Sequence, residues 1–292
     1  MVEKRDYVFP IFNTILLSAF TFICLYPILY IVFASFSEPG MLMQHSGILW
    51  RSLGFTWDGY KLALQNPNIA SGYMNTLFYV AVGTALNLIV TAMGAYVVSR
   101  RDALLAAPIM KGVVFTMYFS GGLVPLYLMV NAMGMNNTRM VVILVSLVSS
   151  WNLIVMRTSF QEIPVSLEES AKIDGAGPLT IFARIFLPLS GPMLATMTLF
   201  YGVGHWNEWF NHMIFLRDRT KFPLQLILRE ILIANDMRST TGMNSVGTYT
   251  NDMYQVLVKY CTIVIATAPI LFLYPFLQRF FIKGVMIGAV KG

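Results

Sequence analysis

The sequence predicts an all-α integral membrane protein with six transmembrane helices. The chain has 292 residues, of which 57% are hydrophobic and only 12% are charged, whereas a soluble domain carries about 25% charged residues. Six apolar stretches approach or exceed the roughly 20 residues that a spanning helix needs. They are about 11–36, 73–98, 112–134, 139–157, 192–216 and 260–281. The first is much longer than the roughly 7–15 apolar residues of a signal peptide, so we interpret it as a retained span.

The basic residues indicate orientation rather than a nucleic-acid partner, because the net charge of +6 is modest and is spread along the chain. Short cytoplasmic loops of membrane proteins carry an excess of Lys and Arg. With both termini inside, eleven basic residues are cytoplasmic: Lys4, Arg5, Arg100, Arg101, Lys111, Arg157, Lys172, Arg184, Arg279, Lys283 and Lys291. The other side has nine, of which six fall in the long segment 217–259, where the rule counts less. The bias predicts a multi-pass protein with both termini cytoplasmic.

The largest polar interruption on the predicted cytoplasmic side is the loop 158–191. Its centre reads Glu168-Glu169-Ser170-Ala171-Lys172-Ile173-Asp174-Gly175-Ala176-Gly177-Pro178 and runs on to Ile185-Phe186-Leu187-Pro188. Two short helices joined by a tight turn fit this pattern, with Gly175 and Gly177 in left-handed conformations and Pro178 starting the second helix. The acidic residues Glu168, Glu169 and Asp174 either cap helices or pair with basic groups. We expect such a loop to face a soluble partner.

Two long segments lie on the predicted outer side. In residues 37–71, Trp50 and Trp57 are interpreted as interfacial anchors. The segment 217–259 holds an amphipathic run from Phe222 to Leu232, which predicts a short helix, followed by a Ser/Thr/Gly/Asn-rich loop at 239–251. Outer loops of this length are expected to contact a neighbouring subunit or a ligand carrier.

Polar residues recur along the fifth span. Tyr201, His205, Glu208 and His212 follow one another at i, i+4, i+7 and i+11, close to one helix face, with Asn211 beside them. Ionisable residues at membrane depth face a bundle interior or a water-filled path. The pattern therefore fits either a lining of a substrate pathway or a polar contact between helices. A metal site is disfavoured, because the spacing is not that of a His-Glu-x-x-His motif.

The third span contains Ser120-Gly121-Gly122-Leu123-Val124-Pro125. This run predicts either a kink that lets helices approach closely or a flexible point in a gating helix. The sequence has no G-x-x-x-x-G-K-[ST] phosphate loop and no recognisable catalytic set. We therefore expect neither an enzyme nor a bound cofactor in this chain.

The loop pattern Glu169-Ser170-Ala171, Asp174-Gly175 and Ile185-x-Leu187-Pro188 closely resembles the Glu-Ala-Ala loop of bacterial ABC importer permeases, with Ser170 in place of the first Ala. Further stretches are similar to the permease subunits of maltose-like carbohydrate importers (MalG-type), so the resemblance covers the whole chain. They are Asn75-Thr76-Leu77, Gly83-Thr84, Ala95-Tyr96, Ser99-Arg100, and the ending Pro275 to Phe281 with Lys283-Gly284 and Gly288 to Gly292. The runs Ser120 to Tyr127 and Phe222 to Gln225 resemble the narrower LplC-like branch, which is associated with complex and uronate-bearing oligosaccharides such as alginate.

The resemblance implies a type I ABC importer permease fold, with 1–292 forming one transmembrane domain and about 73–281 its core. It implies a coupling helix within 158–191 that docks on an ATP-hydrolysing subunit, so that ATP and Mg²⁺ are bound by partners. The residues implied in coupling are Glu168, Glu169, Ser170, Ala171, Asp174, Gly175, Ala176, Gly177, Ile185, Leu187 and Pro188. The implied partners are a second homologous permease, two ATP-binding subunits, an extracytoplasmic binding protein that contacts 217–259, and an oligosaccharide, all at the bacterial inner membrane. The rival interpretation is a self-sufficient secondary transporter or channel.

Overall fold

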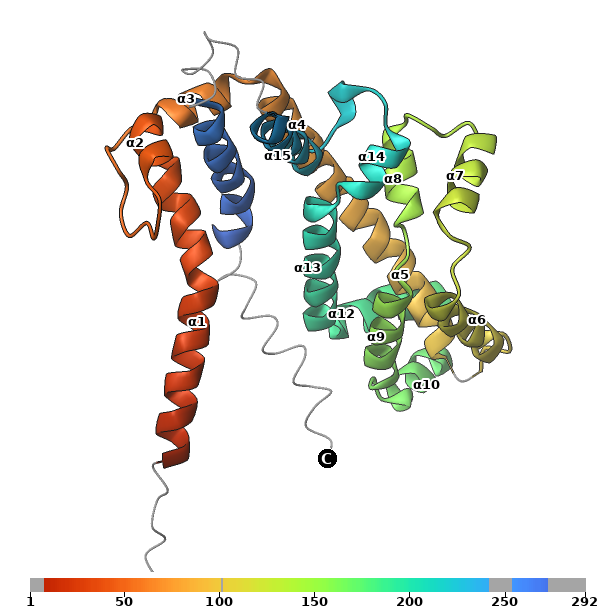
Figure 1. The fold of residues 1–292 in the computed structure, drawn as a ribbon. Coiled ribbons are helices and arrows are strands. Elements are labelled where there is room, and N and C mark those ends of the chain that lie inside the picture. Colours follow the sequence, from red (N-terminus) through yellow and green to blue (C-terminus); the bar gives the residue numbers. More distant parts are fainter. Residues whose placement is uncertain (1–7, 101, 242–253, 273–292) are drawn as a thin grey trace, which may run out of the picture. The chain divides into compact units, whose positions relative to one another are not determined.

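A computed structural model describes residues 8–100, 102–241 and 254–272, and within these ranges the chain is almost entirely helical (Figure 1). The one β pairing found there is an isolated bridge between Ser37 and Phe55. In the described part of the chain, three helices are long and apolar enough to cross a membrane: α1 (Val8–Ser35), the continuous run Pro67–Ser99, and Tyr254–Phe272. Three further pairs of helices pass the same test together but are bent, which brings the total to as many as six spans. The all-α membrane fold is confirmed.

The chain divides into two compact units, each packed mainly against itself. The first consists of 1–69 and 228–269, and the second of 70–227 and 270–292. The first unit contains α1, α2 (Pro39–Gln44), α3 (Asp58–Gln65) and most of the helix Tyr254–Phe272. A single membrane domain over 1–292 stays a prediction.

In the first unit, the last described helix packs closely on α3 at Gly59. A Cβ atom at Gly59 would lie 2.6 Å from both Cys261 Sγ and Leu257 Cγ, so only glycine fits between the two helices. Cys261 is buried, and its thiol donates to the carbonyl of Ser35 at 3.3 Å. The sixth span is already helical at Tyr254, the first described residue of this part and earlier than the predicted 260, and its predicted part 273–281 lies outside the described residues.

The two tryptophans assigned as interfacial anchors both lie in the first unit. The Trp50 ring packs against Phe22 and Tyr26 of α1, at centroid distances of 5.9 and 5.6 Å. The Trp57 ring packs edge-on against Phe36 at 5.0 Å. Both indoles stay more than half exposed. Their role at a membrane interface stays a prediction.

The second unit is built around α5, which packs against α9 and α13 (Figure 1). Its core includes Ala92, Tyr96, Met156 and Phe186 among the buried apolar residues. The elements of this part of the chain, in order, are α4 (Pro67–Phe78), the π-helix η1 (Tyr79–Gly83), α5 (Thr84–Ser99), α6 (Ala106–Tyr118), α7 (Leu123–Ala132), α8 (Arg139–Val145), α9 (Ser150–Gln161), α10 (Val165–Ile173), α11 (Pro178–Ile181), the π-helix η2 (Phe182–Phe186), α12 (Leu187–Leu189), α13 (Gly191–Asn207), α14 (Phe210–Phe215), the 3₁₀-helix η3 (Arg219–Lys221) and the start of α15 (Leu224–Thr241).

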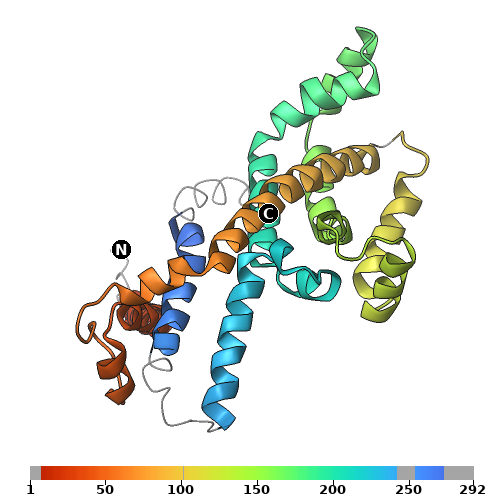
Figure 2. The same ribbon diagram turned by 90° about the horizontal axis from the view of Figure 1, so that it is seen from above.

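The predicted third span is interrupted rather than kinked. Helices α6 and α7 meet at 116°, and both views show them as separate helices joined by a loop (Figures 1 and 2). Gly122 has φ +84°, a conformation that L-residues rarely adopt. A Cβ at Gly121 or Gly122 would come no nearer than 4.0 Å to any atom. Within the described part of this chain no helix packs closely on these glycines, and the backbone turn is what requires Gly122.

The predicted fourth span is also broken, with α8 and α9 inclined by 58°. The break frees the carbonyls of Ser146 and Leu147, and the side-chain amide of Asn87 on α5 donates to both at 2.7 Å. Broken backbone is tolerated at membrane depth when neighbouring groups satisfy it in this way. Asn87 therefore fixes the break from an adjacent helix.

The amphipathic run after Phe222 forms a helix, as predicted, but it begins at Leu224 and continues to Thr241. The predicted polar loop at 239–251 is thus helical at its start. Its remainder, 242–251, lies outside the described residues, as does the C-terminal stretch Gly288 to Gly292.

Candidate functional site

The polar loop 158–191 folds into two helical stretches, α10 and the α11–η2–α12 run, joined by a tight turn. Gly175 adopts φ +80° directly after α10. Its N–H donates to the carbonyl of Lys172 at 3.0 Å, and the N–H of Ala176 donates to Ala171 at 2.9 Å. These two bonds are those of a Schellman motif, in which a left-handed glycine closes a helix C-terminus. The left-handed glycine expected at 175 is confirmed.

The second half of the turn differs from the expectation. Gly177 has φ −73° and ψ 163°, which is extended backbone, so its predicted left-handed conformation is wrong. The reason is Pro178, which starts α11 as predicted and which confines the preceding residue to extended angles. Gly177 acts as the residue before the helix, and Gly175 alone makes the reversal.

The loop presents two faces. Five of the predicted coupling residues point toward the core or are half-buried: Glu168, Ala171, Ala176, Ile185 and Leu187. The other six are exposed: Glu169, Ser170, Asp174, Gly175, Gly177 and Pro188. Ala171 and Ala176, which the Schellman bond joins, both pack on the apolar core next to α5 and α9. The small residues of the motif are thus used for the contact between the turn and the bundle.

Glu168 belongs to a four-residue ion-pair network with Arg100, Asp102 and Lys172. The Glu168 carboxylate contacts the Arg100 guanidinium and accepts from Lys172 Nζ at 2.9 Å, one helical turn away. Arg100 also donates to the Asp102 carboxylate, from Nε to Oδ1 at 3.1 Å and from Nη2 to Oδ2 at 3.0 Å. Lys172 Nζ lies 3.1 Å from Asp102 Oδ2. The side chains of Arg100 and Glu168 are only 12% and 15% exposed. Of the two roles left open for Glu168, pairing with basic groups is the one observed.

These contacts shift the pKa values of Asp102 and Lys172. Hydrogen bonds from Arg100 and then Lys172 hold the pKa of Asp102 well below its usual range. Hydrogen bonds to Glu168 and then Asp102 raise the pKa of Lys172. Asp102 and Lys172 are consequently charged at neutral pH.

The outer face of the loop is apolar with an acidic edge. Ile173 is 86% exposed and Leu179 is 74% exposed, although both are large aliphatic side chains. Glu169, four residues before Ile173 on the same helix, and Asp174, directly after it, are exposed with it. Large exposed aliphatic groups beside charges are typical of an interaction surface.

The polar residues assigned to the fifth span form contacts inside the second unit. The Tyr201 hydroxyl lies 2.8 Å from Thr91 Oγ1 and accepts from the Ser149 N–H at 3.3 Å. His205 Nε2 lies 2.7 Å from Asn87 Oδ1, an oxygen that can only accept, so this ring nitrogen carries the proton. Both side chains are buried between α5 and α13. Their position fits the polar helix contact, and a role in lining a pathway stays a prediction.

The continuous helix face assumed for this set is wrong, because α13 ends at Asn207. Glu208 is extended, with ψ 114°, and its Oε1 accepts from the N–H of Asn211 at 2.9 Å at the start of α14. Beyond the break, His212 is buried and its ring meets Tyr79 at a centroid distance of 4.5 Å. Tyr201 and His205 therefore share one helix, while Asn211 and His212 belong to the next. Glu208 joins the two.

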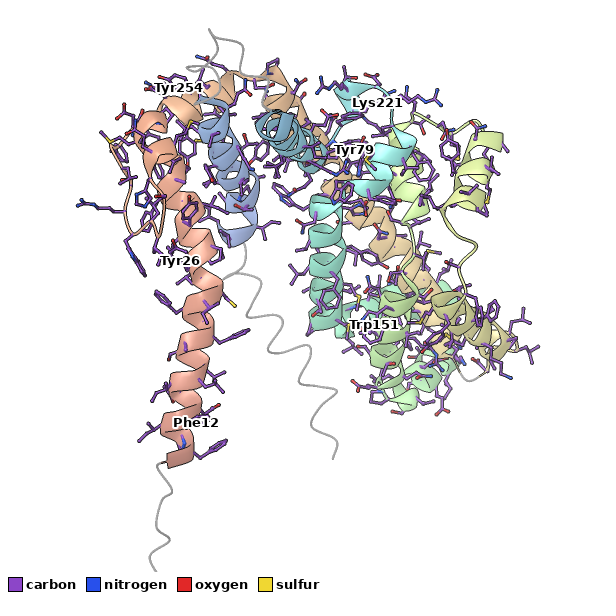
Figure 3. The ribbon with its side chains drawn as sticks, viewed as in Figure 1. Phe12, Tyr26, Tyr79, Trp151, Lys221 and Tyr254 are labelled. Atoms are coloured by element: carbon purple, nitrogen blue, oxygen red, sulfur yellow. The ribbon has the colours of Figure 1, made fainter. Side chains whose placement is uncertain are left out.

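A polar clasp that the sequence did not predict holds residues 217–224 against α4, η1 and the turn before α8. The Asn75 amide donates to the carbonyls of Thr220 and Phe222 at 2.7 and 3.0 Å. Tyr79 OH donates to the carbonyl of Lys221 at 2.9 Å, and Figure 3 shows these two residues side by side. Asn137, at φ +60°, accepts from the N–H groups of residues 217 and 218. The start of the predicted outer segment is thus a fixed structure.

Arg100, Asp102 and Lys172 were missed as site residues. The i,i+4 spacing of Glu168 and Lys172 was a usable signal, since such pairs meet on a helix. No local signal joins Arg100 to Glu168, because the two lie in different loops. Among the described residues, no group of three or more His, Cys, Asp or Glu could hold a metal ion. The expectation that this chain binds no cofactor stays a prediction.

Comparisons with known proteins agree with this architecture, although no family model matches the chain. The chain is 39% identical to Protein LplC of Bacillus subtilis, over 99% of this chain and 97% of that protein. It is 38% identical to the polygalacturonan/rhamnogalacturonan transport system permease protein YtcP of Bacillus subtilis, over 94% of each. The crystal structure of a bacterial ABC transporter that imports the acidic polysaccharide alginate has a chain that superposes with a TM-score of 0.86 at 29% identity, over 96% of this chain and 99% of that one.

Proposed function

The chain belongs to the permease subunits of bacterial carbohydrate ABC importers, and on this premise we propose that the loop 158–191 is its docking element for an ATP-hydrolysing subunit. The loop is then cytoplasmic, with both chain termini on the same side of the inner membrane. A second homologous permease completes the pathway, two ATPase subunits drive it, and an extracytoplasmic binding protein delivers the sugar.

The exposed apolar face of the loop is the observation that carries this proposal. Ile173 is 86% exposed and lies two residues before the left-handed Gly175. Leu179 is 74% exposed and lies two residues after the extended Gly177. Burying one such side chain in a partner contributes roughly 1.5–3 kcal/mol. The acidic edge, Glu169 and Asp174, favours a partner groove with basic groups at its rim.

The proposed substrate is an oligosaccharide that carries uronate groups. The names of two relatives refer to polygalacturonan/rhamnogalacturonan and to the acidic polysaccharide alginate. Anionic sugars call for basic or hydrogen-bonding groups along their path. The Glu208 carboxylate accepts the Asn211 N–H, which supports a structural role for that residue. The positive charge that such a substrate needs is then supplied by the second permease.

The docking proposal is tested with two glycine variants, one inside the turn and one outside the loop. Gly175→Val places a β-branched residue at φ +80°, which costs about 1–3 kcal/mol and opens the Schellman turn. Gly112→Ala on α6 is the control, because Gly112 has open space around it and lies outside the loop 158–191. We expect affinity-tagged G175V to reach the membrane in normal amounts but to retain much less of the co-expressed ATPase subunits, whereas G112A retains them normally.

Ile173→Asp gives an independent test of the same surface. Because the side chain is exposed, the substitution leaves the fold of this chain intact. The loss of its buried area should weaken ATPase retention by about tenfold or more. Normal retention in I173D and in G175V would contradict the docking proposal. Transport by the reconstituted chain alone, without ATP, would instead favour a secondary transporter.

A further inference from the structure

We propose that Arg100 is a positioning residue that locks the docking helix α10 to the end of α5, so that a displacement of α10 is passed to the interior of the bundle. The locking unit consists of Arg100, Asp102, Glu168 and Lys172, called here the ionic joint. The inference rests on the proposed docking role of the loop 158–191. It adds the route by which movement at that loop reaches the membrane.

Arg100 directly follows the last residue of α5, Ser99, and its side chain is fixed on three sides. Its guanidinium binds both oxygens of Asp102, contacts the Glu168 carboxylate and contacts the hydroxyl of Tyr96. It also lies 5.2 Å from the centroid of the Tyr96 ring. A guanidinium held through several of its donors defines a direction as well as a distance, which an ammonium group does not.

The apolar contacts of α10 are too small to fix the helix alone. No residue of α10 is fully buried, and within α10 the apolar residue packed on the core is Ala171. A methyl group on a flat contact leaves a helix free to slide or rotate. Two contacts leave α10 one helical turn apart, Glu168 to Arg100 and Lys172 to Asp102 at 3.1 Å, so the joint determines the orientation of α10.

From the joint, α5 leads to the polar contacts of the interior. Tyr96 packs edge-on against Phe186 at 4.9 Å, Thr91 meets the Tyr201 hydroxyl, and Asn87 holds both His205 and the break between α8 and α9. One unbroken α-helix thus connects the ionic joint to the interrupted fourth span. A helix of this kind transmits displacement along its axis.

The test separates positioning from simple stability. We would prepare Arg100→Gln, Glu168→Gln and the double variant R100Q/E168Q in the complete importer, and measure three quantities. These are the thermal midpoint in detergent, the retention of ATPase subunits, and the stimulation of ATP hydrolysis by the binding protein in liposomes. Each single variant breaks the contact between Arg100 and Glu168 and leaves the remaining, partly buried charge only its more exposed partner, Lys172 for Glu168 and Asp102 for Arg100, whereas the double variant removes both charges.

We expect both single variants to lower the thermal midpoint and the double variant to recover most of the loss. Stimulation of ATP hydrolysis should fall by about fivefold or more in all three, the lower end of common coupling between sites, while the ATPase subunits stay bound. Lys61→Gln, which removes an exposed ion pair with Asp58, is the control and should change nothing. Recovery of stimulation together with stability in the double variant would show a merely structural role and overturn the inference, as would full stimulation in R100Q. If the unmodified chain fails to retain ATPase subunits, the proposed docking function fails instead.

Discussion

Replacement of Gly83 by alanine should destabilise the bundle through one buried histidine. Gly83 ends the π-helix η1 and faces α13. A Cβ at this position would lie 2.5 Å from His205 Nε2 and 2.7 Å from Cε1, closer than atoms in folded proteins approach. The imidazole cannot simply move away, because it is buried and Nε2 is bonded to Asn87 at 2.7 Å. G83A must therefore shift either a helix or this hydrogen bond.

The size of the effect follows from three terms. Overpacking of a core by a methyl group costs about 1–3 kcal/mol. Loss of the hydrogen bond between His205 and Asn87 adds about 1 kcal/mol. The gain in helix propensity from glycine to alanine offsets up to about 1 kcal/mol. The net destabilisation is about 1–3 kcal/mol, or roughly 2–10 °C in thermal midpoint for a chain of this size.

The assay is the thermal midpoint of the purified complex, followed by fluorescence-detected gel filtration. Gly204→Ala is the matched control, since Gly204 lies on α13 with no atom within 4 Å of an added Cβ. It should leave the midpoint unchanged or raise it slightly. In a His205→Ala background the clash disappears, so G83A should no longer destabilise. A G83A midpoint at or above that of the unmodified chain would refute the packing argument.

The ionic joint and the polar clasp give further predictions. Asp102, whose pKa is lowered, contributes stability above its usual value of 3.8 that is lost only as pH falls through the lower folded value. Lys172, whose pKa is raised, contributes fully below 10.5 and loses its contribution above that value. Hydrogen exchange of α10 amides, corrected for intrinsic rates, should therefore show constant protection between about pH 5 and 10, and a transition inside this window would contradict the assigned contacts. In the clasp, Asn137→Gly removes two hydrogen bonds, whereas Asn137→Ala also places a non-glycine residue at φ +60°, so N137A should be about 1–2 kcal/mol less stable than N137G. Asn75→Ala leaves two carbonyls and the Arg139 guanidinium without that partner, and exchange in 217–224 should rise locally while equal protection would argue against the clasp.

The apolar runs of the sequence located the spans, because length and hydropathy are local properties. The interruptions could not be placed from the same information. The doublet Gly121-Gly122 signalled a weak point, but a full 116° reversal depends on the left-handed angle that Gly122 adopts. The break after α8 depends on Asn87, which lies about 60 residues earlier and reaches it only through packing of α5.

The same distinction applies to the site residues. The turn at Gly175 was predictable, since a glycine after a polar helix is a common helix end. The left-handed prediction for Gly177 is wrong because the ring of Pro178 confines the preceding residue to extended angles, even when that residue is glycine. The helical spacing of Tyr201, His205, Glu208 and His212 assumed a continuous helix, and the extended backbone at Glu208 ends that continuity. Periodicity reports which residues share a face only as far as the helix extends.

The two faces of the loop 158–191 also predict two separate sets of correlated substitutions during evolution. Under the proposed docking role, changes at Ile173, Leu179 or Asp174 are constrained by a different polypeptide, the ATPase, and should be matched by changes in its groove. Changes at Glu168 or Lys172 are constrained within this chain and should be matched at positions 100 and 102. Exchanging the exposed residues alone should therefore let the permease bind the ATPase of another importer, while the ionic joint within its own bundle stays unchanged.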